Sequence, residues 1–326
     1  MTGRWAREVL EHSLSRRTFL RTAGAAAAVA AFGTLGCVSA SNPSPTASPT
    51  IVPSIAPASA GNMVVATNAD PVKLVDSALD AFGGLEDVIK SGDKVLLKAN
   101  FSFARTVDQA ASNHPQVLAR IMQRCSSTGA SEVTAFDHTM DNPTICLDKS
   151  GIKAAVDAIG LKVISVNGDK DFEDKTVPGS ALKSIKLAKL MGDADVFINV
   201  PVIKSHSTTR LTAGMKNLMG VIWDRQAFHS NDLDACIADL AAYARPSLVI
   251  ADAYRVLKTG GPQGGGSGDQ VIQPHQLIVG KDPVAVDSYA ATLLGLKGSD
   301  VDHIMCAYRL GLGEYDLGKV PIQKVG

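Results

Sequence analysis

The sequence predicts an α/β fold, in which helices flank a mostly parallel, Rossmann-like sheet, in one domain or two closely joined lobes. Two observations support this prediction. Short apolar runs rich in β-branched residues alternate along the chain with amphipathic helical segments. Polar residues, several of them charged, then recur where the expected strands end. The roughly 265 residues after position 61 are enough to bury a full-sized core.

The first half of this region shows the alternation most clearly. After a short apolar run comes a helical segment that places Val72, Val75, Leu79 and Phe82 on one face. Turn residues separate the later elements, and Gly160 is expected to end the helix at 144–159. The elements expected here are strands at 63–67, 94–101, 132–136 and 162–166, and helices at 71–89, 115–126 and 144–159.

The second half continues the pattern after a less regular stretch. The expected elements are strands at 196–203, 247–251 and 276–279, and helices at 232–244, 284–294 and 301–308. The loop 259–268 holds six glycines but lacks the closing Lys-Ser/Thr pair of a phosphate-binding loop. It is either a mobile lid over a site or a flexible surface loop.

The N-terminus predicts export. Arg16-Arg17 is followed by Phe19-Leu20 and by the weakly apolar run 23–36, which is too short to span a bilayer permanently. Residues 1–37 are therefore interpreted as a twin-arginine export signal. Residues 38–61 contain no charge and are rich in Ser, Pro, Thr and Ala, which predicts a disordered linker before the α/β domain at 62–326.

Cys37 follows the apolar run directly and is preceded by Thr34-Leu35-Gly36. Small residues before a cysteine at this point predict lipoprotein cleavage and acylation of Cys37. Leu35 lies one place later than the usual pattern has it, and the alternatives are ordinary cleavage or an uncleaved anchor. We expect a protein exported by the twin-arginine pathway that is lipid-anchored on the outer side of the cytoplasmic membrane, or periplasmic.

The charge balance argues against a nucleic-acid partner. The chain has 32 basic and 32 acidic residues, and the first 37 residues hold five and two of these, which leaves 27 against 30. Phosphate binding normally requires a basic surplus. An aromatic content of 5% is also low for a surface that stacks bases.

The cysteines give no cluster motif. Cys125, Cys146, Cys236 and Cys306 are widely separated, and no Cys-x-x-Cys pair occurs. This spacing argues against a ferredoxin-type iron–sulfur cluster and against a structural zinc ribbon. Buried thiols on helices are the expected state, and a single disulfide of undetermined pairing is the alternative.

Four expected strands end on polar residues. These are Lys98 with Asn100, Asp137 with His138, Lys204 with His206, and Asp252. The segment 193–220 is the most informative of them, because a buried strand leads into several cations and an amide without a carboxylate. In open α/β sheets the ligand crevice lies outside the carboxyl ends of the strands, so a shared site is predicted there.

The residue types suggest an anion site. Lys204 and Lys216 would bind or activate the substrate, and a lysine buried among cations has a lowered pKa that suits nucleophilic or proton-transfer chemistry. His206 and His229 are candidates for general acid/base roles, and Asp252 for holding one of these groups. The candidate substrate-binding residues are Lys98, Asn100, Asn217 and Gly261.

A metal site is the rival arrangement. His206, His229, Asp137 and Asp252 form a nitrogen and oxygen ligand set, although not at a diagnostic spacing. The lysines would be costly near a metal ion unless they held its anionic ligand. The cofactor, if there is one, is not identified by the sequence.

Several blocks together match a known family. They are Lys94-Val95-Leu96-Leu97-Lys98-Ala99-Asn100, His114-Pro115, Asn199-Val200-Pro201, Lys204-Ser205-His206, Lys216-Asn217-Leu218-Met219-Gly220, His229, Asp252, Gly261-Pro262 and Asp282-Pro283-Val284-Ala285-Val286-Asp287. From about Gly92 onward the chain resembles the bacterial and archaeal proteins grouped as domain of unknown function 362. The resemblance implies that the candidate residues belong to family signature blocks, but it implies no reaction. Some relatives are fused to iron–sulfur modules, which hints at redox chemistry, although this chain has no cluster-binding cysteines.

The sequence therefore favours an exported, lipid-anchored enzyme that acts on a small anionic or carbonyl-containing substrate. Two alternatives remain open at this point. One is a tethered binding protein that captures an anionic ligand or a metal complex without turnover. The other is a redox or assembly partner in an exported complex.

Overall fold

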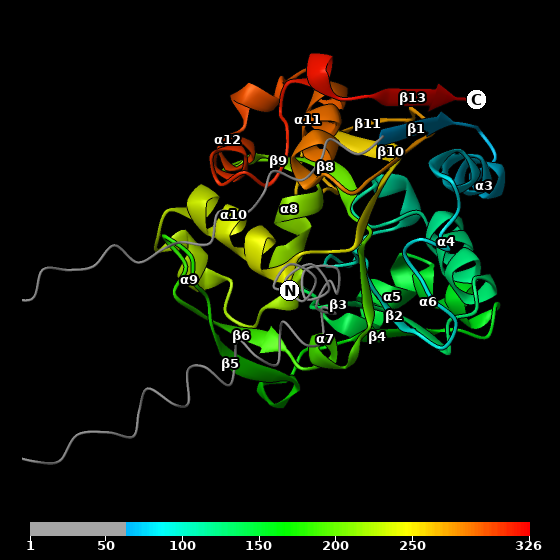
Figure 1. The fold of residues 1–326 in the computed structure, drawn as a ribbon, viewed down its shortest axis with the longest axis horizontal. Helices are drawn as coiled ribbons and strands as arrows, with labels where there is room; N and C mark the ends of the chain where they lie inside the picture. Colours follow the sequence, from blue (N-terminus) through cyan, green and yellow to red (C-terminus); the bar gives the residue numbers. More distant parts are fainter. Residues whose placement is uncertain (1–62) are drawn as a thin grey trace, which may run out of the picture.

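The computed structural model describes residues 63–326, which form an α/β domain around a mostly parallel central sheet (Figure 1). The main path of the sheet runs β13-β1-β12-β10-β7-β2-β3-β4. Of these eight strands, β12 is antiparallel to both of its neighbours and the others run in one direction. The α/β fold and the mostly parallel sheet are thus confirmed, whereas a division into two lobes is not.

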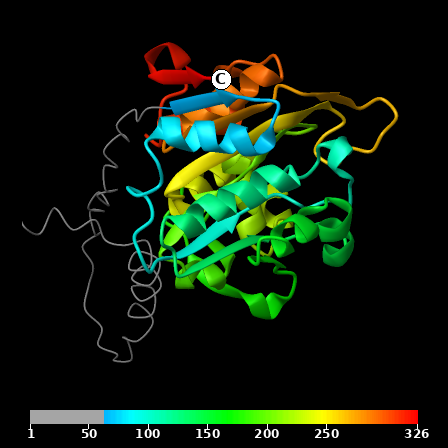
Figure 2. The ribbon, with the colours of Figure 1, turned by 90° about the vertical axis from the view of Figure 1, so that its right-hand side faces the viewer.

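The strands of the main path are β1 (Met63–Thr67), β2 (Lys94–Lys98), β3 (Glu132–Asp137), β4 (Lys162–Ser165), β7 (Val196–Asn199), β10 (Leu248–Thr259), β12 (Gln276–Gly280) and β13 (Ile322–Val325). The remaining strands are β5 (Phe172–Thr176) and β6 (Ser184–Ala188), which pair with each other, and β8 (Val202–His206), β9 (Arg210–Thr212) and β11 (Gln270–Ile272), which extend the sheet beside β10. In Figure 2 the orange hairpin of β10 and β11 projects from one side of the domain.

Helices cover both faces of the sheet. On one face lie α3 (Pro71–Phe82), α4 (Pro115–Ser127), α5 (Pro143–Lys149) and α6 (Ile152–Asp157). On the other lie α8 (Gly214–Asn217), α10 (Leu233–Ala244), α11 (Pro283–Leu293) and α12 (Asp302–Arg309). The short helices α7 (Leu190–Asp193) and α9 (Gln226–His229) complete the set. Side chains of a strand alternate between the two cores, as Val95 and Leu97 pack on one face and Leu96 on the other.

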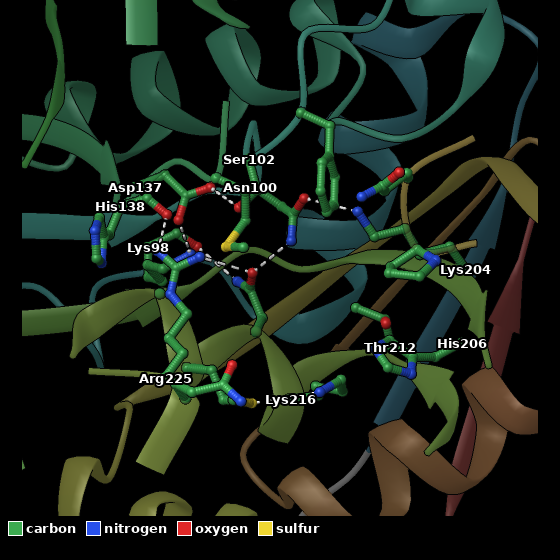
Figure 3. A pocket seen from close by; sticks show the side chains of 18 of the residues that line it. Lys98, Asn100, Ser102, Asp137, His138, Lys204, His206, Thr212, Lys216 and Arg225 are labelled. Carbon is green, nitrogen blue, oxygen red and sulfur yellow. Dashed lines mark hydrogen bonds and ion pairs between the residues drawn. The ribbon is translucent and has the colours of Figure 1, made fainter. Parts of the chain in front are cut away.

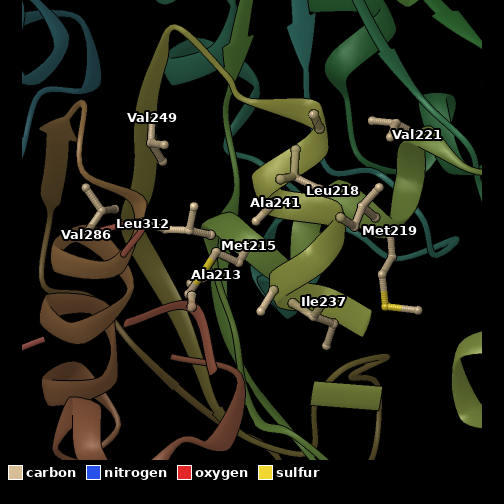
Figure 4. Packing of buried hydrophobic residues seen from close by; sticks show 14 of the residues in the cluster. Ala213, Met215, Leu218, Met219, Val221, Ile237, Ala241, Val249, Val286 and Leu312 are labelled. Atoms are coloured by element: carbon tan, nitrogen blue, oxygen red, sulfur yellow. The ribbon is translucent and has the colours of Figure 1, made fainter. Parts of the chain in front are cut away.

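Apolar packing fixes the segment that carries Lys216. Within α8 and the turn after it, Met215 and Leu218 are buried in one cluster with Ile237 and Ala241 of α10 (Figure 4). Burial of a large apolar side chain contributes about 1.5–3 kcal/mol, so these contacts hold α8 firmly. The polar residues of the same short helix, Lys216 and Asn217, are buried as well.

Several expected elements have different boundaries. The single strand expected at 196–203 is divided into β7 and β8 by Pro201, which has no N–H to donate to a ladder. The helix expected at 144–159 is broken into α5 and α6 at Gly151, which has φ 70°. The helix expected at 71–89 ends at Phe82, because Gly83 adopts the left-handed conformation with φ 99°.

Two further differences affect the site. The expected strand 94–101 ends at Lys98, so Asn100 lies in the loop that follows β2. The strand expected at 247–251 continues to Thr259, which places Asp252 inside β10 and not at its end. The strands β5, β6, β9, β11 and β13 were not expected, because they are short or mostly polar.

The cysteines of the described region are free thiols, three of them buried and Cys306 half-buried. Within residues 63–326, no helix is long and apolar enough to cross a membrane. The predicted export signal, Cys37 and the linker 38–61 lie outside the described residues.

Candidate functional site

A cavity of about 480 Å³ lies at the carboxyl ends of β2 and β3 (Figure 3). Its size is in the range of small-molecule sites. It is lined by Lys98, Asn100, Ser102, Phe103, Asp137, His138, Met140, Lys204, His206, Thr212, Lys216, Asn217, Met219, Gly220, Trp223, Asp224, Arg225, Gln226, His229, Pro262 and Gln263. The predicted crevice at the carboxyl edge of the sheet therefore contains most of the candidate residues.

Lys98 and Asp137 form a buried ion pair on one side of the cavity. Their strands are adjacent and parallel, and the Lys98 Nζ lies 2.8 Å from the Asp137 Oδ1. The other carboxylate oxygen accepts hydrogen bonds from the Phe101 N–H and the Ser102 hydroxyl, both at 2.9 Å. Burial lowers the pKa of Lys98, and the Asp137 carboxylate opposes this shift. The pair therefore joins the ends of β2 and β3, and the hydrogen bonds to Asp137 also hold the loop after β2 in place.

Three asparagines connect β2, β7 and α8. The Asn217 Oδ1 accepts a hydrogen bond of 2.9 Å from the Asn100 amide and one of 3.2 Å from the Lys98 Nζ. The Asn217 amide in turn donates to the Asn199 Oδ1 at 2.8 Å. Each amide uses both its donor and its acceptor side, which fixes the rotamers. Asn100 is thereby oriented with its Oδ1 toward Lys204.

Lys204 is a fully buried amine without a carboxylate partner among its hydrogen bonds. Its Nζ donates to the Asn100 Oδ1 at 3.1 Å and to the Ala111 carbonyl at 2.7 Å, and lies 5.2 Å from the centre of the Phe103 ring. The pKa of Lys204 is lowered to about 7, chiefly by burial, against an opposing effect of the Asp137 carboxylate and with smaller contributions from the charges of Lys98 and Lys216. A neutral amine has two N–H groups, which these two oxygens satisfy, and one free lone pair.

Lys216 is a second buried amine, but its hydrogen bonding is poor. Its Nζ donates at 3.3 Å to the Met219 Sδ, and a thioether is a weak acceptor. Burial lowers the pKa of Lys216 to about 8, against an opposing effect of Asp234. An ammonium with so few acceptors is suited to hold an anionic ligand group.

The structure changes the role expected for His206. Its Nδ1 accepts hydrogen bonds from the backbone N–H groups of Thr208 at 3.1 Å and Thr209 at 3.3 Å, so the ring proton belongs on Nε2. Burial lowers the pKa of His206 to about 3, helped by the charges of Lys216 and Lys204. The ring therefore stays neutral near pH 7 and acts as a hydrogen-bond donor, which is a different role from the expected acid/base catalyst.

His229 and Gly261 lie at the edge of the cavity. His229 is the last residue of α9 and is exposed, although its side chain is among those that line the cavity. Gly261 precedes two lining residues and donates its N–H to the Ser205 Oγ at 3.1 Å. A Cβ at this glycine would lie 2.0 Å from the Ser205 carbonyl oxygen, so the glycine is required for close approach of the two loops.

Asp252 does not line the cavity. Its carboxylate accepts hydrogen bonds from the backbone N–H groups of His114 at 2.8 Å and Tyr254 at 3.0 Å, and from the Asn113 amide at 3.3 Å. The Asn113 Oδ1 then accepts from the Asn100 N–H at 2.6 Å. Asp252 thus stabilises the loop that contains Asn100 through Asn113. It forms no hydrogen bond with the side chain of His206 or His229.

The suggested metal ligands are not assembled. Asp137, His206 and His229 line the cavity, but Asp137 is paired with Lys98, and Asp252 lies outside the lining. Across residues 63–326, no group of three or more His, Cys, Asp or Glu side chains is placed to hold a metal ion. The structure therefore does not bring the four suggested ligands together around one point.

Arg225 and Thr212 stand out among the lining residues that the sequence analysis did not name. Arg225 donates a hydrogen bond to the His138 carbonyl, while its buried Nε has no hydrogen-bond partner in the described part of the chain. Burial lowers the pKa of Arg225. Thr212 presents a buried hydroxyl beside Lys204. Neither residue belongs to a motif, but both flank the block around Lys216, and a search of that neighbourhood for polar residues would have found them.

The family assignment comes from a family model. The model for "Domain of unknown function (DUF362)" matches residues 95–292, a range that includes every residue of the cavity lining. The chain belongs to the DUF362 family. A thylakoid-associated protein of Synechocystis sp. is 24% identical to it over 242 residues, which are 72% of this chain and 73% of the relative.

Two solved structures are similar in fold to this DUF362 protein. The lactate racemase apoprotein of Thermoanaerobacterium thermosaccharolyticum has 13% identity and a TM-score of 0.42, over 65% of this chain and 53% of that one. A protein from Thermotoga maritima has 10% identity and a TM-score of 0.47, over 69% and 59%. The chain thus spans little more than half of either structure.

We expect the stability difference between Lys204→Met and the wild type to depend on pH. Between pH 9 and pH 7 the folded-state amine is largely neutral, whereas the unfolded lysine, with a pKa near 10.5, is protonated. Wild-type stability therefore falls as the pH is lowered from 9 to 6, and the variant gains about 2 kcal/mol relative to it. Urea unfolding at both pH values measures this. The exposed Lys73→Met is the control and should show no such trend.

Asp252→Ala is expected to destabilise the fold by about 2–3 kcal/mol, because it leaves buried backbone N–H groups without an acceptor. Asp252→Asn keeps one acceptor oxygen and should lose less. Thermal unfolding of both variants checks the order. Equal stability of Asp252→Ala and the wild type would contradict the supporting role.

Proposed function

We propose that this DUF362 protein is an enzyme that acts on a small anionic carbonyl compound, with the Lys204 amine as its reactive group. One observation carries the proposal, namely the environment of Lys204. A fully buried amine with a pKa of about 7 and both N–H groups held by fixed oxygens has a free lone pair at neutral pH. Lysines tuned in this way serve as nucleophiles or bases toward carbonyl substrates.

The charges of the lining explain the preference for an anion. Lys98 is neutralised by Asp137, but Lys216 and Arg225 have no carboxylate within ion-pair distance in residues 63–326. Asp224 also lines the cavity, yet its carboxylate accepts from the N–H groups of Gln226 at 3.0 Å and Ala227 at 3.2 Å at the start of α9. A carboxylate or phosphate group of the substrate would complete the charge balance beside Lys216 and Arg225.

The reaction step proposed for Lys204 is addition to the carbonyl carbon. The nitrogen lone pair forms the N–C bond, and the π electrons of the carbonyl move to its oxygen. A proton passes from the nitrogen to that oxygen, and loss of water then gives an imine. Lys204 needs no separate base to begin this sequence, because about half of the amine is already neutral at pH 7.

A tethered binding protein is the second candidate, and the unpartnered donors favour it. Lys216 and the Arg225 Nε could hold an anion tightly without any reaction. The two functions differ in what they require of Lys204, since catalysis needs a neutral, reactive amine there, whereas capture by Lys216 and Arg225 does not. Reactivity of the amine at pH 7 therefore decides between them.

Glyoxylate with cyanoborohydride is the probe for this amine. Glyoxylate carries a carboxylate and an aldehyde, and the hydride reduces the imine to a stable carboxymethyl-lysine. At pH 7 we expect Lys204 to be modified at least tenfold faster than the exposed Lys73, because far more of its amine is neutral. Peptide mapping by mass spectrometry measures both rates. The rate at Lys204 should reach half of its plateau near pH 7.

Two comparisons make this test specific. Lys98 lines the same cavity, but its ion pair with Asp137 should protect it from modification. Lys204→Met should remove the fast phase without changing the modification of Lys73. A Lys204 that reacts no faster than Lys73 would reject the enzyme proposal. Quenching of Trp223 fluorescence by glyoxylate would then support the binding protein, since Trp223 is the tryptophan of the cavity and of residues 63–326.

We also propose that the protein is exported through the twin-arginine pathway and held at a membrane surface by a lipid on Cys37. The motif at residues 16–20, the position of Cys37 and the uncharged linker support this. A thylakoid-associated relative is consistent with a membrane surface. An anchor on a 24-residue spacer would leave the domain free to reach soluble substrates.

Cys37→Ser is expected to move the protein from the membrane fraction to the soluble fraction of the exported compartment, because it removes the acylated residue. Fractionation followed by immunoblotting measures the shift. Arg16→Lys with Arg17→Lys should instead retain the precursor in the cytoplasm. A Cys37→Ser protein that stays with the membrane would exclude lipidation at this cysteine.

A further inference from the structure

Thr212 has a buried hydroxyl that nothing in the fold explains. It lies on β9, is 5% exposed and lines the cavity. Its Oγ1 forms no hydrogen bond with any group of residues 63–326. A buried hydroxyl without a partner costs about 1–3 kcal/mol, and valine would fill the same space without that cost. A polar group kept at this position suggests a partner that comes from outside the protein.

The hydroxyl lies on the strand that pairs with the strand of Lys204, and both side chains line the same cavity. β8 and β9 pair in antiparallel fashion, and Lys204 lies opposite Thr212 in the register. Residues opposite each other in such a pair project from the same face, with Cβ atoms about 4.5–5.5 Å apart. The two side chains therefore enter the cavity together, as Figure 3 shows.

His206 adds a second donor on the same strand. It is two residues after Lys204 on β8, so both side chains leave the strand on the same face. With its Nδ1 occupied by the N–H groups of Thr208 and Thr209, the neutral ring carries its proton on Nε2. Thr212 and His206 are thus two neutral hydrogen-bond donors in the cavity that Lys204 also lines.

We propose that the Thr212 hydroxyl and the His206 Nε2–H form an oxyanion subsite, which binds the carbonyl oxygen of the substrate while Lys204 adds to the carbonyl carbon. The inference rests on the proposed function and assigns two further residues to the same site. As the N–C bond forms, the carbonyl oxygen becomes an alkoxide, and both donors strengthen their hydrogen bonds to it. The alkoxide then takes the proton released by the Lys204 nitrogen.

Neutral donors suit this position better than cations. A permanent positive charge at this position would bind the carbonyl oxygen in the ground state as well as during the addition. A hydroxyl and a neutral imidazole interact most strongly with the charge that develops during the addition. Lys216 remains the partner of the charged group of the substrate, since its poorly hydrogen-bonded ammonium lines the same cavity.

The test uses Thr212→Val and Thr212→Ser with glyoxylate and cyanoborohydride. We expect Thr212→Val to slow modification of Lys204 by about tenfold to a hundredfold, because the intermediate loses one donor. Thr212→Ser keeps the hydroxyl and should remain within about threefold of the wild type. The pH at which the rate is half of its plateau should be unchanged in both, since neither substitution removes a charge. His206→Phe should produce a loss similar to that of Thr212→Val.

Three outcomes separate this inference from the proposed function. Fast modification of Lys204 in the wild type together with an equal rate in Thr212→Val would overturn the subsite and leave the reactive amine in place. A Thr212→Val protein with a shifted pH midpoint would also overturn it, because the hydroxyl would then act on the amine. Absence of fast modification in the wild type would reject the proposed function, and the subsite with it.

Thermal unfolding gives an independent readout. Thr212→Val should be as stable as the wild type or more stable, because it removes an unsatisfied buried hydroxyl. A residue that serves the fold would instead lose stability on substitution. Slower modification with a clearly lower unfolding temperature would assign Thr212 a structural role and overturn the inference.

Discussion

The ion pair between Lys98 and Asp137 is the interaction on which the rest of the site depends. It joins the ends of two neighbouring parallel strands, and the same carboxylate holds the Phe101 N–H and the Ser102 hydroxyl of the loop after β2. The pair also sets a steric limit on the chain that passes over it. A Cβ at Gly220 would lie 2.4 Å from the Lys98 Cε and 2.5 Å from the Asp137 Oδ1, so the turn after α8 can approach only as glycine. That close approach brings Asn217, and with it Lys216, into the cavity.

The two fully buried lysines differ in the groups that their amines contact. Lys98 and Lys204 have the same exposure, and burial lowers the pKa of both. The amine of Lys98 faces a carboxylate, which offsets part of the free energy lost on desolvation. The amine of Lys204 faces an amide oxygen and a carbonyl oxygen, which orient it without stabilising a full charge. Under the proposed function, the stability lost by burying Lys204 is the cost of keeping a neutral, reactive amine, a trade that is common in active sites.

The sequence predicted the location of the cavity in the fold better than it predicted which residues line the cavity. Parallel strands end at one edge of a sheet, so Lys98, Asp137 and Asn100 could be brought together from strand order alone. Asp252 was misplaced because β10 runs on past it, and nothing in the local pattern marks where a strand leaves the sheet. Pro201 divided a run that appeared continuous, which made Lys204 part of a second strand with its own partner, β9. The pairing of β8 with β9 places Thr212 opposite Lys204. Such a register could not be predicted here, because the periodicity of one strand does not say which residues of another strand lie opposite it.

The placement of the cations limits where a substrate's negative charge can lie. An anion in direct contact with the Lys204 Nζ would raise the pKa of that amine and return it to the protonated, unreactive form. The anion must therefore be held at a distance from the amine, beside Lys216 and Arg225, while the uncharged carbonyl approaches Lys204. Thr212 and His206 meet the same requirement, because neutral donors stabilise charge on the substrate oxygen and add no permanent field at the nitrogen. Under the proposed function, a neutral amine at one place and cations at another thus favour a substrate whose carbonyl and anionic group are separate parts of one molecule.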